Sequence, residues 1–286
     1  MVVLVAGGSG QLGQSLQFIA VNYREIKFHF LSSSELDISD KENCEKVFQQ
    51  IKPEYVINAA AYTAVDKAES EPEKAKAINV EGAKNLAETC QEFNATLVHI
   101  STDFVFDGNK TTPYKEQDAA NPTGVYGQTK LDGEKAVEAI LKAHFIIRTS
   151  WLYSQFGNNF MKTMIRLGKE RDSLSVVADQ FGTPTNAVEL AKAVIAIIKK
   201  AESLANNQSA LNRLYGTYHF SNEGQCSWFD FAKKIMEVND IEVDLKPIPT
   251  SGYPTPAQRP KYSVLDKSKI RENFGIKINN WEDNVS

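Results

Sequence analysis

The chain has few of the residues that build metal centres and disulfide frameworks. Its 286 residues include three cysteines and four histidines. The cysteines, at positions 44, 90 and 226, are odd in number and far apart, which is typical of reduced thiols in a reducing compartment. The histidines lie in apolar, strand-like stretches and form no group with the cysteines. The sequence therefore predicts packed core histidines and no bound metal.

An excess of basic residues and long apolar runs are also missing. Lysine and arginine total 32 against 36 aspartates and glutamates, a net charge of −4. This leaves no basic stripe to neutralise phosphates, so no nucleic-acid partner is expected. There is no apolar run of about 18 residues and no charged, apolar leader, so we expect no membrane association and a cytoplasmic protein. With 42% hydrophobic residues, the chain can bury a sizeable core.

Glycine is concentrated near the start of the chain. An apolar run from Val2 leads to Gly7, Gly10 and Gly13, and is typical of a buried parallel strand that turns sharply into a helix near Gln11. In a dinucleotide site Gly7 permits the turn, Gly10 lets the backbone approach the pyrophosphate, and Gly13 lets the helix pack closely on the strand. The spacing resembles that of extended short-chain dehydrogenases. A glycine-rich turn without a ligand is the alternative.

Tyr126 and Lys130 stand four residues apart in the run Val-Tyr-Gly-Gln-Thr-Lys. Four residues is about one helical turn, so both side chains project from one face, where the ammonium can lower the phenol's pKa from about 10 toward working pH. A tyrosine so placed can act as a general acid. The pattern is also common on surface helices, and it gains meaning from the glycine motif upstream.

Strand-like and helical segments alternate through the first half of the chain. Strands are expected at 2–6, 26–31, 54–58, 95–100 and 144–149, and helices near 11–21, 40–51, 71–93 and 124–142. The alternation predicts an α/β fold, a Rossmann-like doubly wound parallel sheet, with residues 1–150 as the NAD(P)-binding domain.

The pattern loosens in residues 151–286. A helix near 158–170, a strand at 174–178 and a helix at 187–200 precede a polar stretch from 201 to 213. We interpret this half mainly as a smaller C-terminal substrate-binding lobe, with some segments returning to the main domain. The five prolines between 247 and 260 predict an ordered loop that folds over a site, because they disfavour a helix or a central strand.

Several motifs occur in an order that resembles the dTDP-4-dehydrorhamnose reductase family. Besides Tyr126 to Lys130 they are Asn58-Ala-Ala-Ala-Tyr-Thr63, Val65-Asp-Lys-Ala-Glu69, Ser101-Thr-Asp-Phe-Val-Phe-Asp-Gly108, Arg148-Thr-Ser-Trp-Leu-Tyr153, Gly157-Asn-Asn-Phe160, Asp179-Gln-Phe-Gly-Thr-Pro-Thr185 and Tyr253-Pro-Thr-Pro-Ala-Gln-Arg-Pro260. The resemblance covers nearly the whole chain. It implies that NADPH or NADH reduces the 4-keto group of dTDP-4-dehydrorhamnose, a dTDP-sugar, to give dTDP-L-rhamnose for bacterial surface polysaccharides.

The resemblance also implies the roles of individual residues. Thr102 polarises the ketone, Tyr126 protonates the developing alkoxide, and Lys130 holds the nicotinamide ribose. The other cofactor-binding residues are Gly7, Gly10, Gln11, Leu12, Gly13, Ser32, Asp37, Ile38, Ala59, Ala60, Ala61 and Thr63. The substrate-binding residues are Val65, Thr102, Asp103, Phe104, Trp151, Asn159 and Arg259, of which the last two are donors to the diphosphate.

These assignments have structural alternatives. The Thr102 hydroxyl could hydrogen-bond to its own backbone at the end of a strand. Trp151 could be a core residue, and Asn159 and Arg259 could be surface residues.

The end of the second strand bears on the choice of cofactor. An Asp or Glu there would bond the ribose hydroxyls and repel the extra phosphate of NADPH, whereas an Arg would attract it. This chain offers Ser32 to Ser34, with Glu35 beyond the strand end and Asp37 and Ile38 beside the adenine. The sequence therefore predicts that neither NADH nor NADPH is strongly excluded.

Three features depart from the pattern of the family that the chain resembles. Phe104 stands where many members have tyrosine, so one hydroxyl near the sugar is lost. Ser15 stands where some members have a glutamate that holds magnesium between subunits, so we expect a monomer or a homodimer without a metal bridge. The sequence also ends soon after Trp281, without the amphipathic helix that is usual there.

Two other classes of function remain open. A non-catalytic relative, like the regulatory beta subunit of methionine adenosyltransferase, would keep the fold and bind NADP as a partner protein. Another extended short-chain enzyme, an epimerase or a dehydratase of nucleotide sugars, would share the glycines. A dehydratase needs an acid pair after the position of Thr102, whereas Asp103 is followed here by Phe104. The sugar-side motifs favour the reductase.

Overall fold

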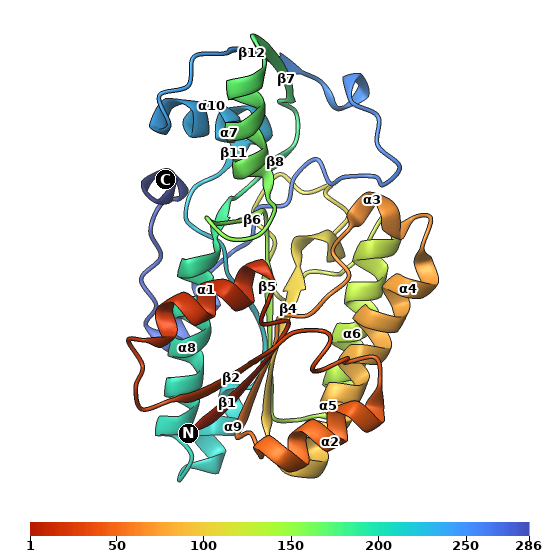
Figure 1. The fold of residues 1–286 in the computed structure, drawn as a ribbon, viewed down its shortest axis with the longest axis vertical. Helices are drawn as coiled ribbons and strands as arrows, with labels where there is room; N and C mark the ends of the chain where they lie inside the picture. Colours follow the sequence, from red (N-terminus) through yellow and green to blue (C-terminus); the bar gives the residue numbers. More distant parts are fainter. Residues whose placement is uncertain (286) are drawn as a thin grey trace.

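The apolar runs of the first half form a parallel six-stranded sheet with the order β10-β5-β4-β3-β1-β2. The computed structural model describes residues 1–285. The strands are β1 Val2–Ala6, β2 Lys27–Leu31, β3 Tyr55–Asn58, β4 Thr96–Thr102, β5 His144–Thr149 and β10 Gly216–His219. Parallel neighbours need crossover connections, which here are helices on both faces of the sheet (Figure 1). The expected doubly wound α/β fold is confirmed.

Helices of the first half connect these strands. They are α1 Gln11–Ala20, α2 Lys41–Ile51, α3 Val65–Ala68, α4 Pro72–Lys76, α5 Gly82–Phe93 and α6 Val125–Ile140. The single helix expected over 71–93 is instead α4 and α5 joined by a π-helical segment, Ala77–Glu81. Within that segment Asn79 is buried and connects the loop after β3 to α6, accepting from Tyr62 N at 2.9 Å and donating to Thr129 Oγ1 at 3.1 Å.

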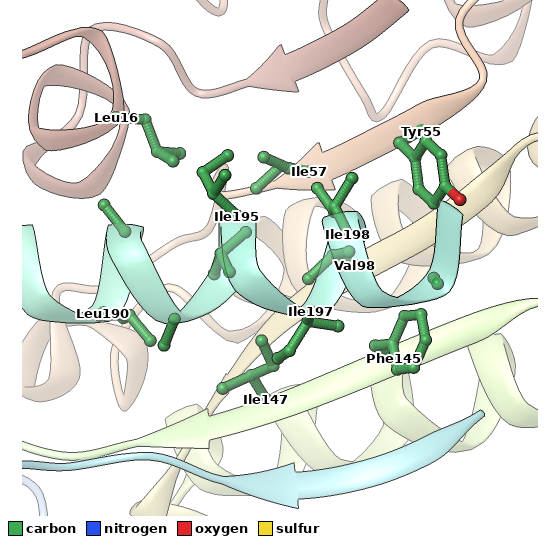
Figure 2. Packing of buried hydrophobic residues seen from close by; sticks show 14 of the residues in the cluster. Leu16, Tyr55, Ile57, Val98, Phe145, Ile147, Leu190, Ile195, Ile197 and Ile198 are labelled. Atoms are coloured by element: carbon green, nitrogen blue, oxygen red, sulfur yellow. The ribbon is translucent and has the colours of Figure 1, made fainter. Parts of the chain in front are cut away.

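Alternate strand residues build a core on each face of the sheet. On one face, Ile57, Val98 and Ile147 pack against α8 Ala187–Ser203 together with α1 (Figure 2). On the other face, Leu4 and residues of β3, β4 and β5 pack against α2, α5 and α6. Because both faces are covered, the strands read as continuous apolar runs in the sequence.

The second half supplies a smaller lobe, drawn at the top of Figure 1. Its elements are β6 Leu152–Tyr153, α7 Phe160–Glu170, β7 Ser173–Val177, β8 Phe181–Gly182, β9 Thr185–Asn186, β11 Cys226–Ser227, α10 Trp228–Val238 and β12 Asp244–Ile248. Met161, Leu174 and Phe231 belong to its own hydrophobic core. In contrast α8, α9 Gln208–Leu214, β10 and α11 Ser268–Phe274 pack on the core of the main sheet.

Two segments are more regular than expected. The polar stretch 201–213 is largely helical, since α8 continues to Ser203 and α9 begins at Gln208, where Asn207 Oδ1 accepts from Ala210 N at 3.1 Å. Pro247 lies in β12, so the expected loop begins only after Ile248. Because β12 pairs with β7 alone, it is an edge strand, where the missing N–H of proline is tolerated.

The cysteines and most histidines lie as expected. All three cysteines are buried free thiols, and His99, His144 and His219 are buried. His29 is the exception, since it is partly exposed on the edge strand β2. In residues 1–285, the structure has no helix that is both long and apolar enough to span a membrane.

Candidate active site

A cleft with a volume of about 620 Å³ lies at the carboxyl ends of β4 and β5, between the main sheet and the lobe. This end of a doubly wound sheet is where ligands bind, and the volume suits a ligand site. The sequence-predicted residues that line it are Gly10, Gln11, Leu12, Ala59, Ala61, Thr63, Val65, Thr102, Asp103, Phe104, Tyr126, Lys130, Trp151, Asn159 and Arg259. Motifs from both halves of the chain therefore meet in one place.

Six of the expected cofactor residues do not line this cleft: Gly7, Gly13, Ser32, Asp37, Ile38 and Ala60. Gly7, Gly13 and Ala60 lie in and beneath the glycine turn. Asp37 is exposed beyond the end of β2, and Ile38 is buried where a Cβ on Gly82 would touch it.

The glycine turn has the geometry that the sequence predicts. Gly7 has a φ of +80°, and a Cβ there would lie 2.7 Å from Ala60 N. A Cβ on Gly13 would overlap the carbonyl of Gly7. The helix N-cap, Gly10, makes no side-chain capping bond, so the first N–H groups of α1 remain available at the cleft. Such groups favour phosphate oxygens.

Thr102, Tyr126 and Lys130 converge on the cleft. Thr102 Oγ1 donates to Asp103 Oδ1 at 3.0 Å and accepts from Phe104 N at 3.2 Å. Lys130 is buried, and its Nζ donates to the carbonyl of Ile100 at 2.7 Å. All three side chains therefore line one cleft, with the Thr102 hydroxyl beside the Tyr126 phenol.

Phe104 packs edge-on against the ring of Tyr126, with centroids 5.5 Å apart and planes at 73°. The apolar ring restricts the position of the phenol and adds no hydrogen-bonding group beside it.

Burial controls the protonation of these groups. It raises the pKa of Tyr126 to about 12, opposed by the neighbouring Thr102 hydroxyl and reinforced by the Asp103 carboxylate. Burial also lowers the pKa of Lys130 to about 8, partly offset by the carboxylate of Glu134. The pKa of the phenol therefore moves upward and away from working pH, contrary to the prediction, because desolvation is the largest of these effects. Burial likewise raises the pKa of Asp103 to about 6.

Glu134 belongs to a buried ion pair that the sequence analysis missed. It lies one turn beyond Lys130 on α6 and is 1% exposed. Arg148, at the end of β5, donates to it from Nη2 at 2.6 Å and from Nε at 2.9 Å. The i, i+4 spacing from Lys130 was a usable signal, because residues so spaced share a helix face.

Three polar atoms that have no partner within residues 1–285 belong to residues lining the cleft: Asp103 Oδ2, Ser101 Oγ and Thr149 Oγ1. A buried polar group left unpaired costs about 1–3 kcal/mol. Their residues lie at the ends of β4 and β5 and line the cleft together with the uncapped start of α1, which fits a polar ligand with phosphates and hydroxyls. A dinucleotide and a sugar nucleotide both have this chemistry.

Trp151 is part of an aromatic wall on the lobe side. It stacks on Trp228 with ring centroids 3.5 Å apart, and Phe160 packs on Trp228 with centroids at 4.6 Å. Trp151 has a positive φ of 46°, and a Cβ on Gly182 would lie 2.5 Å from its ring. The wall therefore fixes an indole whose backbone is strained.

Trp228 lines the cleft but was not predicted from the sequence. The run from Ser227 to Asp230 forms a capping box at the start of α10. That local signal could have located the helix start, although only the tertiary fold brings it to the cleft.

Asn159 and Arg259 line the cleft and also have protein partners. Asn159 Nδ2 donates to Gln11 Oε1 at 2.7 Å, and its Oδ1 accepts from Lys162 N to cap α7. Arg259 Nη2 donates to Asp66 Oδ2 at 2.7 Å, which ties the proline-rich loop to α3. Any diphosphate contact by Arg259 would use its remaining N–H donors.

Glu35 turns back onto the end of β2. Its Oε2 accepts from Ser32 Oγ at 2.7 Å and from Ser32 N at 2.9 Å, and these bonds lower the pKa of the carboxyl group. Glu35 thus lies beyond the end of β2, as expected, but its carboxylate folds back onto Ser32. A negative charge is held where dinucleotide folds bind the adenosine ribose.

The chain is similar to known proteins over its full length. Residues 1–286 match the family model described as the RmlD substrate binding domain. The dTDP-4-dehydrorhamnose reductase of Aggregatibacter actinomycetemcomitans is 42% identical over 286 residues, which cover 98% of this chain and 95% of the relative.

Two crystal structures of dTDP-4-dehydrorhamnose reductases, each 42% identical, cover 99% of this chain and 96% of their own. The enzyme of Clostridium acetobutylicum has a TM-score of 0.92, and that of Bacillus anthracis, in complex with NADP, has 0.91. With full-length similarity and the motifs gathered in one cleft, the chain belongs to the dTDP-4-dehydrorhamnose reductase family.

Proposed function

We propose that the protein reduces the 4-keto group of dTDP-4-dehydrorhamnose to dTDP-L-rhamnose, using NADPH or NADH. The observation that carries this proposal is the meeting of Thr102, Tyr126 and Lys130 in a cleft beside an uncapped glycine turn. Full-length membership of the family supports the same reaction. The product would supply activated rhamnose for bacterial surface polysaccharides.

The bound reduced dinucleotide supplies a hydride to the carbonyl carbon, and the protein supplies the proton. Tyr126, with a pKa of about 12, is protonated at neutral pH and donates its proton to the developing alkoxide. Thr102 Oγ1 turns from Asp103 to donate to the ketone oxygen and so polarises it. Lys130, charged below its pKa of about 8, holds the nicotinamide ribose and stabilises the negative charge beside it.

The proposed placement of the ligands uses residues that line the cleft and, at the glycine turn and the adenosine end, residues that lie outside it. The turn from Gly7 to Gly13 would hold the pyrophosphate, with Ser32, Asp37 and Ile38 at the adenosine, and Ala59 to Thr63 along the nicotinamide half. Val65, Asp103, Phe104 and Trp151 would surround the sugar, with Asn159 and Arg259 toward the diphosphate. Residues 1–150 would then act as the cofactor-binding domain and 151–286 mainly as the substrate-binding lobe, in a cytoplasmic monomer or homodimer.

The direct test supplies dTDP-4-dehydrorhamnose with NADPH and follows the loss of reduced-cofactor absorbance, with the product identified by mass spectrometry and NMR. Stoichiometric formation of dTDP-L-rhamnose is expected. Cofactor binding without turnover would favour a regulatory subunit. A tightly retained NAD in the purified protein, with the sugar epimerised, would favour an epimerase.

A further inference from the structure

One side chain of the glycine turn is bonded to the lobe. Gln11, the first residue of α1, donates from Nε2 to the carbonyl of Leu152 at 3.1 Å. Its Oε1 accepts from Asn159 Nδ2 at 2.7 Å and from Ser154 Oγ at 3.3 Å. All three partners lie in the segment from Leu152 to Phe160, which leads from β5 into the lobe. Both hydrogen-bonding atoms of the Gln11 amide are therefore used between the two halves of the cleft.

The same segment carries part of the proposed sugar-nucleotide site. Asn159 caps α7, and Phe160, the first residue of that helix, packs against Trp228 in the aromatic wall. Gly157 has a φ of +61°, and a Cβ there would be in van der Waals contact with the Cβ of Gln11, at 3.5 Å. A shift of Gln11 would therefore move this segment and, with it, the residue that caps α7.

Other glutamines of α1 stay within the glycine turn. Gln14 Nε2 donates to Ser9 O at 2.8 Å, and Gln17 Nε2 donates to Gly8 O at 2.9 Å. Neither lines the cleft. Gln11 therefore differs from its neighbours in its bonds to the lobe.

We propose that Gln11 couples the two ligand sites, so that the dinucleotide and the sugar nucleotide each strengthen the binding of the other. A dinucleotide that orders the backbone of Gly10 to Leu12 also fixes the Gln11 amide and, through it, the segment from Leu152 to Phe160. The second ligand then meets a segment that is already ordered and loses less entropy on binding. The coupling must be equal in both directions. Gln11 acts here as a positioning residue, and the inference rests on the proposed placement of the two ligands.

The test is calorimetric binding of dTDP with and without saturating NADP⁺, a pair that cannot turn over. In the wild-type protein we expect dTDP to bind about tenfold more tightly when NADP⁺ is present, and NADP⁺ to bind tighter by the same factor when dTDP is present. Gln11→Leu should bring this factor close to one. The matched control Gln14→Leu should keep the wild-type factor, because its bond stays within the turn.

Ser154→Ala approaches the same contact from the lobe and leaves the glycine turn intact, so it serves if Gln11→Leu does not fold. It should reduce the factor in part, with little change in the affinity for NADP⁺ alone. A wild-type factor of one overturns the coupling, and so does an unchanged factor in folded Gln11→Leu or Ser154→Ala. A folded wild-type protein that binds NADP⁺ but no dTDP would instead overturn the proposed function.

Discussion

At the scale of single residues, burial determines the charge of the reacting groups. The spacing of Tyr126 and Lys130 is local, so the sequence shows that they share a helix face. Their protonation depends on burial, which arises only in the fold. The relation of the two residues was therefore predictable, whereas the direction in which the pKa of the phenol moves was not.

Tyr126→Phe should retain cofactor binding and lose most turnover. The phenol proton is needed only as charge develops on the alkoxide, so removing it costs about a hundredfold or more in kcat. Binding of NADP⁺ by calorimetry and single-turnover reduction of the keto sugar measure the two effects separately. Turnover near the wild-type rate would mean that another group donates the proton.

Lys130→Met should lower activity and remove the alkaline limb of the wild-type pH profile. A lysine whose pKa is lowered to about 8 is charged below that pH and neutral above it, so wild-type activity should decline above about pH 8. Tyr126, with a pKa of about 12, keeps its proton throughout this range. The measurement is kcat/KM from pH 6 to 10. A decline near pH 8 that persists in the variant would assign the limb to a different group.

Glu35→Gln should shift cofactor preference toward NADPH. The wild-type carboxylate, held against Ser32, opposes the extra phosphate, but its exposure to solvent screens the repulsion. We expect wild-type kcat/KM values for NADH and NADPH to lie within about a hundredfold, and the variant to move their ratio by less than about tenfold. Paired steady-state kinetics on one keto sugar provide both ratios. A wild-type preference above about a thousandfold would require a further charged residue at the ribose.

At the scale of secondary-structure elements, the sequence is most informative where the signal is local. The glycine turn and the first five strands follow from residue types and spacing. His219 was expected in a strand-like stretch, but β10 was not predicted as a strand of the main sheet, because its pairing with β5 is set by tertiary contacts. The π-helical segment also escaped prediction, since it depends on the buried contacts of Asn79 with Tyr62 and Thr129.

Trp228→Leu should weaken binding of the sugar nucleotide without affecting the cofactor. Trp151 would lose its stacking partner and, with it, part of the packing that holds its strained backbone. A stacked aromatic pair contributes about 0.5–1.5 kcal/mol, so KM for the keto sugar should rise by up to about tenfold. Trp281→Phe, within the lobe core, is the control for loss of a buried tryptophan. An unchanged KM for the sugar, or an equal loss of NADP⁺ affinity, would contradict a role for the aromatic wall in substrate binding.

At the scale of the whole molecule, the two halves of the sequence are interleaved. α8, β10 and α11 come from the second half but complete the core of the main sheet. Two bonded pairs then join the two halves of the sequence at the cleft, Gln11 with Asn159 and Asp66 with Arg259. The motifs predict which residues line the cleft. The hydrogen bonds between the two halves depend on distances between side chains in the folded protein, which the spacing of residues in the sequence does not give.

For the whole molecule we predict that neither activity nor assembly depends on a metal ion. Ser15, which the resemblance described above implies to stand at the position of a magnesium-binding glutamate, is fully buried and donates from its hydroxyl to the Gln11 carbonyl at 2.9 Å. It thus offers no charge to a cation, and hard cations favour carboxylates. Within the described residues, the structure shows no group of three or more His, Cys, Asp or Glu side chains suited to a metal ion.

We therefore expect turnover and sedimentation behaviour to be the same in EDTA and in magnesium, whether the chain is a monomer or a homodimer. Both should be measured on one preparation, with EDTA removed by dialysis before magnesium is added, because chelation can act slowly on a buried site. Activity lost in EDTA and restored by magnesium would show that the enzyme requires the metal. Dissociation of a dimer in EDTA, with activity retained, would instead assign the metal to assembly alone and would place its ligands at a position other than Ser15.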